Sequence, residues 1–144
     1  MAIEYRINHP LSADLFIDVL KRSTLSARRP VEDRACMEGM LQNSNLQVSA
    51  WDRGTLVGIA RALTDFHYAC YLSDLAVDVA YQGDGIGSCL QRRIQGKLGP
   101  HCKMIVISAP AANAYYEHIG YINNPRCWVL AREQSIGTPR SALE

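Results

Sequence analysis

The sequence predicts a mixed α+β domain, and three observations lead to this fold class. Segments with strand-like alternation of apolar and polar residues are interspersed with segments whose apolar residues recur at helical spacing. A glycine-rich loop at residues 82–88 joins an apolar segment to an amphipathic one, as in a β-loop-α unit. The chain has 144 residues, which suits one domain with a sizeable core.

The first third of the chain predicts one strand and two helices. Residues 3–7 alternate apolar and polar side chains, as a half-buried strand does. Ser12 is a suitable N-cap for a helix whose apolar residues recur at helical spacing up to residue 20. A linker at 23–30 then interrupts the pattern before the second helix. It contains Arg28 and Arg29, for which solvent-exposed positions are expected.

The middle of the chain predicts three antiparallel strands followed by a β-loop-α-β unit. Residues 46–51 and 55–63 flank a glycine-containing turn, and residues 68–77 form the third β-rich run. The helix after the loop, at 86–98, has an apolar residue at every fourth position. Residues 103–108 form the next strand, and we expect a right-handed parallel crossover between 68–77 and this strand.

The last part of the chain predicts a helix, a final strand and a tail. The helix spans about 111–119 and ends at Gly120, and residues 126–131 form the last strand. The expected order is therefore β-α-α-β-β-β-α-β-α-β. We predict one domain over 1–132 and a mobile C-terminal tail at 133–144.

The composition excludes several classes of protein. Hydrophobic residues make up 48% and charged residues 20%, which is typical of a globular protein. The net charge is +1 with both signs interspersed, so neither a nucleic acid nor a membrane surface is an expected partner. The five cysteines lack metal-ligand spacing and Cys-x-x-Cys pairs. We therefore expect reduced thiols in a cytoplasmic protein without a metal site.

Two familiar phosphate-binding patterns do not fit the glycine loop. A P-loop needs a lysine that reaches the outer phosphates, and residues 82–88 contain none. A dinucleotide fingerprint starting at Gly83 would have Ser88 at its third glycine position. The acid expected about 20 residues later would fall in the apolar run around Ile105. Both patterns are therefore disfavoured.

A third pattern, Gln/Arg-x-x-Gly-x-Gly/Ala, is met at every specified position by residues 82–87. This loop resembles the acetyl-CoA-binding motif of the GNAT superfamily of N-acetyltransferases. Residues 112–121, a helix with Asn and Tyr followed by Gly and an aromatic residue, resemble a second motif of that family. The resemblance covers about 55–121. It implies an acyl-CoA N-acyltransferase fold, with a mixed central sheet of about six to seven strands flanked by about four helices.

The resemblance also implies the donor and the residues that bind it. The donor would be acetyl-CoA, with CoA as product, and its pantetheine arm would pair with an exposed strand edge. That edge is formed by Leu75, Ala76 and Val77, whose backbone would also polarise the acetyl carbonyl. Asn113 and Tyr116 would reach the pantetheine and the sulfur. The pyrophosphate would bind backbone N–H groups of Gln82, Gly83, Asp84, Gly85, Ile86, Gly87 and Ser88.

Two side chains are candidates for proton transfer. Tyr116 is three residues from Asn113 and so shares its helix face, and its phenol could donate a proton to the leaving thiolate. Two core tyrosines at 115 and 116 are the alternative. Asp74 lies beside the proposed oxyanion site and could act as the base, directly or through water. An ordinary turn or edge carboxylate explains Asp74 equally well.

The implied function is transfer of an acetyl group from acetyl-CoA to a primary amine of a small molecule by direct nucleophilic attack. A CoA-binding module without catalysis and a protein N-terminal or lysine acetyltransferase are the alternatives. Residue pattern does not identify the acceptor amine. Homodimers are common in the superfamily, so a homodimer is also considered by analogy.

Overall fold

The computed structural model describes residues 2–137, which form one five-stranded sheet with the order β1-β2-β3-β4-β5. Neighbouring strands from β1 to β4 are antiparallel, and β5 is parallel to β4, as predicted for the β-loop-α-β unit. The strands are β1 (Glu4–Ile7), β2 (Leu46–Asp52), β3 (Thr55–Thr64), β4 (Ala69–Val77) and β5 (Lys103–Val106).

Within 2–137, four α-helices and three short 3-10 turns lie between the strands or, in the case of η3 and α4, after the last one. The helices are α1 (Ala13–Arg22), α2 (Arg34–Asn43), α3 (Ile86–Gln95) and α4 (Asn113–His118), and the 3-10 turns are η1 (Leu25–Arg28), η2 (Val79–Tyr81) and η3 (Pro110–Ala112). None of the helices formed within 2–137 is long and apolar enough to cross a membrane.

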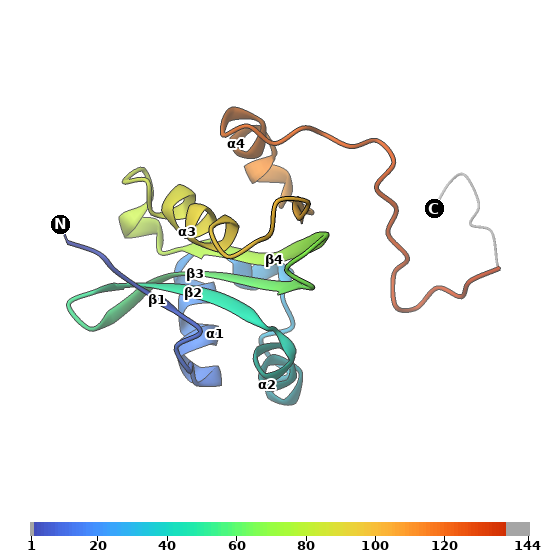
Figure 1. The fold of residues 1–144 in the computed structure, drawn as a ribbon. Coiled ribbons are helices and arrows are strands. Elements are labelled where there is room, and N and C mark those ends of the chain that lie inside the picture. Colours follow the sequence, from blue (N-terminus) through green and yellow to red (C-terminus); the bar gives the residue numbers. More distant parts are fainter. Residues whose placement is uncertain (1, 138–144) are drawn as a thin grey trace.

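The helices cover the two faces of the sheet, and each face has its own apolar cluster. Figure 1 shows α1 and α2 on one side of the sheet and α3 on the other. Phe16, Leu20 and Met37 pack against Ile59 on the α1 and α2 side. On the opposite side, the buried apolar residues of α3 pack against β2, β3 and β4. They are Ile86, Leu90 and Ile94.

The predicted fold class and the element order from β1 to α4 are confirmed, but the predicted strand at 126–131 is wrong. Within 2–137 the sheet has five strands, not six to seven. The chain after α4 leads away from the sheet (Figure 1), so no strand lies beside this segment to complete a backbone ladder. Trp128 is accordingly 89% exposed and Val129 is 68% exposed. Of the predicted tail at 133–144, residues 138–144 lie outside the described residues, and the domain boundary stays a prediction.

The end of β4 is fixed by the last turn of α1. Ser12 caps α1 as predicted, since its Oγ accepts the N–H of Leu15 at 3.1 Å. At the other end of α1, the Arg22 guanidinium donates to the Asp78 carboxylate at 2.6 Å and to the Leu56 carbonyl at 2.5 Å. These contacts hold Asp78, the residue that follows β4 and precedes η2 and the glycine loop.

A β-bulge at Ser73 divides β4 into two parts. Arg61 of β3 pairs with Asp74, whereas the next residue, Ala62, pairs with Leu72, so Ser73 is an extra residue in β4. The pairing between β4 and β5 ends at this point, with Leu72 opposite Val106. From the bulge onward, among the described residues, β4 has no strand on the side where β5 lies. The structure thus has an open strand edge at 73–77.

The turn between β3 and β4 is predicted to lose its stabilising effect in acid. The Asp65 carboxylate accepts the N–H groups of His67, Tyr68 and Ala69 at 3.0, 2.8 and 3.0 Å, which lowers its pKa to about 2. The contribution to stability is therefore present above the unfolded pKa of about 3.9 and is lost as the pH falls through about 2. In urea unfolding, Asp65→Asn should be less stable than wild type at pH 6, with the difference shrinking toward pH 2. A difference that stays constant with pH would contradict this.

Candidate functional site

The glycine loop adopts a backbone that favours glycine. Gly83 has φ +90° and Gly85 has φ +80°, in the left-handed region that L-residues avoid. A Cβ at either position would have no atom within 4 Å, so conformation and not space requires glycine here. Residues 82–85 are exposed, and at Gly83 and Gly85 no side chain covers the backbone.

The N-terminus of α3 has unsatisfied N–H groups directed at this loop. Gly85 is the N-cap and has no side chain to accept them, and the first helical hydrogen bond runs from the Cys89 N–H to the Gly85 carbonyl at 3.0 Å. Within 2–137, the amides of Ile86, Gly87 and Ser88 have no hydrogen-bond acceptor. Together with the helix dipole, these donors make a site suited to an anion such as a pyrophosphate.

The glycine loop and the open edge of β4 adjoin each other. The Gln82 side chain donates from Nε2 to the Val77 carbonyl at 3.0 Å and so ties the start of the loop to the end of β4. Asp78 donates its N–H to Val57 on β3 at 2.8 Å. Because strand residues alternate their hydrogen-bonding direction, the backbone groups of Val77 and Leu75 face away from β3, toward the open side. The predicted pantetheine edge and pyrophosphate loop thus form one continuous backbone surface.

Helix α4 is fastened to α3 through the buried side chain of Gln91. Its Nε2 donates to the Tyr115 hydroxyl at 3.0 Å, and its Oε1 accepts from the Tyr121 hydroxyl at 2.9 Å. The Tyr115 hydroxyl also lies 3.2 Å from Ser88 Oγ. A Cβ at Gly87 would lie 3.2 Å from the same hydroxyl, so this glycine permits the close approach of α4. Tyr115 therefore has a packing role.

Tyr116 differs from its neighbour in having no hydrogen-bond partner for its hydroxyl within 2–137. Its ring packs edge-on against Tyr115 and Tyr121, with centroids 5.3 Å apart in both cases. Burial and the neighbouring Tyr115 raise the pKa of Tyr116 to about 12, and the positive charge of Arg29 opposes this rise. The phenol therefore keeps its proton at physiological pH and can serve as a donor but not as a base.

A cavity of about 1180 Å³ lies beside α3, β5 and α4. Ser88, Asn113 and Tyr116 are among the residues that line it, whereas neither 75–77 nor 82–87 does. The Asn113 Oδ1 accepts from Ser108 Oγ at 3.0 Å at the start of α4. The predicted cofactor-binding residues thus form two groups, 75–77 with 82–87 and Asn113 with Tyr116, and Ser88 adjoins both.

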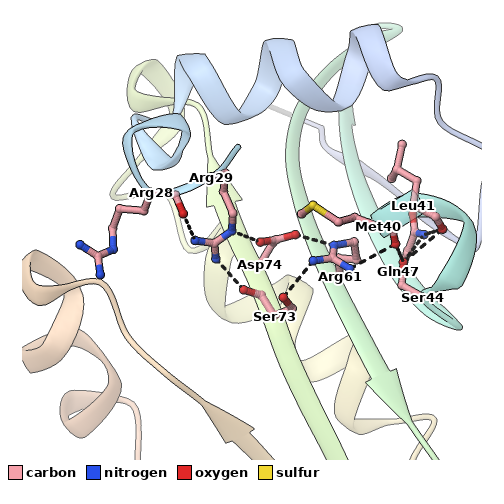
Figure 2. A network of polar contacts seen from close by, with 9 residues as sticks. All are labelled: Arg28, Arg29, Met40, Leu41, Ser44, Gln47, Arg61, Ser73 and Asp74. Atoms are coloured by element: carbon pink, nitrogen blue, oxygen red, sulfur yellow. Dashed lines mark hydrogen bonds and ion pairs between the residues drawn. The ribbon is translucent and has the colours of Figure 1, made fainter. Parts of the chain in front are cut away.

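Asp74 has surroundings that do not favour the predicted role of base. The residue is 1% exposed, and its two carboxylate oxygens accept from Arg29 Nε and Arg61 Nε, each at 2.5 Å. Figure 2 shows the carboxylate held between the two guanidinium groups. Both oxygens are engaged and solvent is excluded, so a substrate amine has no direct route to this carboxylate. The base role stays a prediction.

The structure corrects the expectation for Arg29 and adds residues that the sequence analysis missed. Arg28 is exposed as expected, but the Arg29 side chain is 20% exposed and paired with Asp74. Nothing in the sequence signals this pairing, since the partners are 45 residues apart. Gln91 could have been found, because it lies four residues after Gly87 and thus on the same face of α3.

Loss of the Gln91 contacts should loosen α4. Gln91→Leu removes the hydrogen bonds of Gln91 to Tyr115 of α4 and to Tyr121 just after α4, and it leaves the Tyr121 hydroxyl without a partner within 2–137, at a cost of about 1–3 kcal/mol in unfolding free energy. Urea unfolding measures the loss, and limited proteolysis should cut the segment around α4 faster. The matched control is Gln95→Leu, at an exposed position of the same helix. Equal effects of the two substitutions would contradict the assigned role.

Two other kinds of chemistry, metal binding and nucleophilic attack by Cys70, lack support among the described residues. Within 2–137, no three His, Cys, Asp or Glu side chains are grouped so that they could hold a metal ion. Cys70 is fully buried, and burial raises the pKa of its thiol, which disfavours the nucleophilic thiolate.

Comparisons with known proteins agree with this geometry. The family described as acetyltransferase (GNAT) domain matches residues 23–126. Among solved structures, a Staphylococcus aureus protein of unknown function that is grouped with the acetyltransferases superposes with a TM-score of 0.74 at 18% identity, covering 92% of this chain and 100% of that one. No curated protein sequence matches the chain.

Two further structures similar to this chain have named activities. A ribosomal-protein-alanine N-acetyltransferase from Brucella melitensis superposes with a TM-score of 0.68 at 20% identity, covering 90% of this chain and 99% of that one. The aminoglycoside N-acetyltransferase AAC(6')-Iy, in complex with a CoA bisubstrate analogue, has a TM-score of 0.70 at 17% identity and covers 94% and 100%. These likenesses show the fold, and the family match spans more than half of the sequence. The chain therefore belongs to the GNAT acetyltransferase family.

Proposed function

We propose that the chain is an acetyl-CoA-dependent N-acetyltransferase that acetylates a primary amine of a small molecule. The observation that carries this proposal is the continuous surface formed by the open edge of β4 and the uncapped N-terminus of α3. Such a surface offers backbone pairing to an amide-bearing arm and N–H donors to a pyrophosphate. Acetyl-CoA contains an amide-bearing pantetheine arm followed by a pyrophosphate, in the order in which the surface offers these contacts.

The residues present fit this donor in their chemistry. The amides of 86–88 would hold the pyrophosphate, and the glycines at 83 and 85 leave room for its approach. The outward-facing backbone groups of Leu75 and Val77 would pair with the pantetheine amides. Asn113 is polar and exposed at the start of α4, and its side chain would contact the arm from the opposite side.

The thioester supplies an activated acetyl group, and the residues of this chain would orient it and stabilise the charges that develop. A neutral amine attacks the carbonyl carbon, a C–N bond forms and the C–S bond breaks. A backbone N–H of β4 would stabilise the carbonyl oxygen. Tyr116 would donate a hydrogen bond to the leaving sulfur, and the proton lost from the amine passes to solvent or to a base that the sequence predicts as Asp74.

A small-molecule amine is the proposed acceptor, and a protein N-terminus is the second candidate. The first is supported by the similarity to an aminoglycoside acetyltransferase and by the large cavity beside Tyr116. The second is supported by the similarity to a ribosomal-protein-alanine acetyltransferase. Assays of thiol release with a panel of small amines and a panel of N-terminal peptides would separate the two.

Acetyl-CoA and CoA are expected to raise the melting temperature of the protein. A ligand that binds only the folded state stabilises it by about 2.7 kcal/mol at a concentration of 100 Kd, which is several degrees for a domain of this size. Differential scanning fluorimetry with each ligand up to millimolar concentration measures the shift, and ATP and NAD serve as controls for general nucleotide binding. If neither acetyl-CoA nor CoA shifts the transition, the proposal should be abandoned.

Binding without turnover would indicate the alternative of a CoA-binding module. Such a protein would show the thermal shift but release no thiol with any amine. Its Tyr116→Phe variant would change CoA affinity at most. Turnover of any amine above the rate of acetyl-CoA hydrolysis rejects this alternative.

A further inference from the structure

The carboxylate of Asp74 is part of a cluster of three charges at the β-bulge of β4, in which Asp74 and Arg61 are buried and Arg29 is partly buried (Figure 2). Both arginines also bind the bulge residue Ser73. Arg29 Nη2 donates to the Ser73 carbonyl at 2.7 Å, and Arg61 Nη2 donates to Ser73 Oγ at 2.9 Å. Arg61 also donates to the Met40 carbonyl of α2 at 3.2 Å. The cluster therefore connects the linker after α1, β3, β4 and α2.

The cluster carries an uncompensated positive charge. It contains two guanidinium groups and one carboxylate, so one positive charge is in excess. Within 2–137, neither Arg29 nor Arg61 has another carboxylate as ion-pair partner. The side chains are 20% exposed for Arg29, 5% for Arg61 and 0% for Asp74. Solvent and salt therefore screen this charge much less than a surface charge.

The excess charge lies where the open edge of β4 begins. The contacts of Arg29 are with Ser73 and Asp74, directly before Leu75. The opposing effect of Arg29 on the pKa of Tyr116 shows that its charge also reaches the phenol on α4. Arg29 therefore contacts β4 where its open edge begins, and its charge acts on the phenol of α4, which the proposed function places across the thioester from that edge.

We propose that Arg29, held in place by Asp74, supplies a fixed positive charge that stabilises the thiolate of CoA as it leaves. The inference rests on the proposed function, which places the pantetheine sulfur at this end of the β4 edge. As the C–S bond breaks, the bonding electron pair goes to sulfur, and a nearby cation lowers the free energy of that anion. Asp74 is then a positioning residue that orients the Arg29 guanidinium.

The other cations near this position are exposed, so solvent screens their charges: Arg28 precedes Arg29 in the chain, and Arg92, Lys103 and Arg126 line the cavity that Tyr116 also lines. Arg61 lies behind Asp74, and the phenols that interact around α4 are Tyr115, Tyr116 and Tyr121, all neutral when protonated. Cys70 is buried, with its thiol pKa raised. Removal of the Arg29 charge should therefore raise the pKa of the CoA thiol.

The decisive measurement is the pKa of the thiol of bound CoA, which requires no knowledge of the acceptor. Thiolate absorbance in the ultraviolet is followed against pH with protein in excess over CoA, for wild type and for Arg29→Gln. A unit charge at a partly buried site shifts a neighbouring pKa by about one unit, so the bound thiol should titrate about one unit higher in the variant. With an identified amine, kcat should fall about tenfold.

Two further variants separate charge from structure. Arg29→Lys keeps the charge but loses the forked contact with Ser73 and Asp74, so it should retain most of the thiol pKa of wild type. Arg34→Gln removes an arginine on α2 that forms ion pairs with Asp14 and Glu38. This variant should leave the thiol pKa unchanged.

Each outcome has a distinct meaning. A thiol pKa that is the same in wild type and Arg29→Gln overturns the inference and leaves the proposed function intact. Equal thiol pKa values in Arg29→Lys and Arg29→Gln overturn it as well, because the effect would then be structural. Absence of CoA binding in the folded wild type overturns both this inference and the proposed function. Circular dichroism and urea unfolding establish that each variant is folded.

Discussion

Gly85→Ala is expected to weaken CoA binding by at least about tenfold. The alanine must either adopt φ +80°, which costs about 1–2 kcal/mol, or rotate the loop and displace the amides that follow. Its Cβ would also project from a position where no side chain now covers the backbone. Hydrogen bonds to a charged group are worth about 1.5–3 kcal/mol each, so loss of one amide contact accounts for the tenfold change. Isothermal titration calorimetry with CoA measures the effect.

Gly54→Ala is a matched control for this prediction. Gly54 lies in the turn between β2 and β3, has φ +82°, and a Cβ there would likewise have no atom within 4 Å. Both alanines therefore impose the same kind of backbone strain in open space, and urea unfolding should show similar losses of stability. CoA affinity should fall in Gly85→Ala alone. Equal loss of affinity in both variants would mean that strain and not the loop surface determines binding.

The sequence predicted the parts of the site that depend on local chemistry. The glycines at 83 and 85 are required by backbone conformation, and such a requirement is visible as a pattern of glycines between a strand and a helix. Apolar periodicity located the strands and helices from β1 to β5 because their apolar residues pack into the two clusters on the faces of the sheet. The preference for Tyr116 over Tyr115 came from family resemblance, and the unpartnered hydroxyl of Tyr116 supports it.

The parts that could not be predicted depend on contacts between distant segments. Asp74 could be placed on a strand, but its two arginine partners come from a linker and from β3. The bulge at Ser73 is a property of strand register, which apolar alternation alone does not specify. At residues 126–131 the sequence predicted a strand that the structure does not form. Their β-forming composition predicts a strand, yet a strand needs a neighbour, and none of the described residues provides one.

The charge cluster and the open edge of β4 are consequences of the same irregularity. The extra residue at Ser73 ends the pairing with β5 after Leu72 and exposes a carbonyl and a hydroxyl that Arg29 and Arg61 bind. Without those contacts, the Ser73 carbonyl and hydroxyl would lose these hydrogen bonds at a position that is only partly exposed. The arginines therefore stabilise the conformation that leaves residues 73–77 unpaired. This dependence explains why a charged cluster lies directly beside the proposed thioester position.

Tyr116→Phe is expected to lower kcat about a hundredfold, with little change in the KM for acetyl-CoA. Loss of one hydrogen-bond donor to a charge that develops in the transition state typically costs about 10²–10³-fold in kcat, and the phenol would act on the leaving sulfur and not on the bound ground state. Steady-state thiol release with an identified amine measures both constants. The control is Tyr68→Phe, which removes the hydroxyl of a tyrosine that is 64% exposed in the turn between β3 and β4. Full kcat in Tyr116→Phe would remove this residue from the mechanism.

The pH dependence provides an independent test of how Tyr116 acts. With its pKa raised to about 12, the phenol stays protonated across pH 7–10, so the ratio of wild-type to Tyr116→Phe kcat should be constant over this range. A phenol with an ordinary pKa of about 10 would be half ionised at pH 10, and the ratio would fall by about half there. Because a pKa of about 12 exceeds that of a thiol, about 8.5, complete proton transfer to the thiolate is unfavourable. The expected contribution of Tyr116 is therefore a hydrogen bond that strengthens as charge develops on sulfur, and this contribution should not vary with pH below 10.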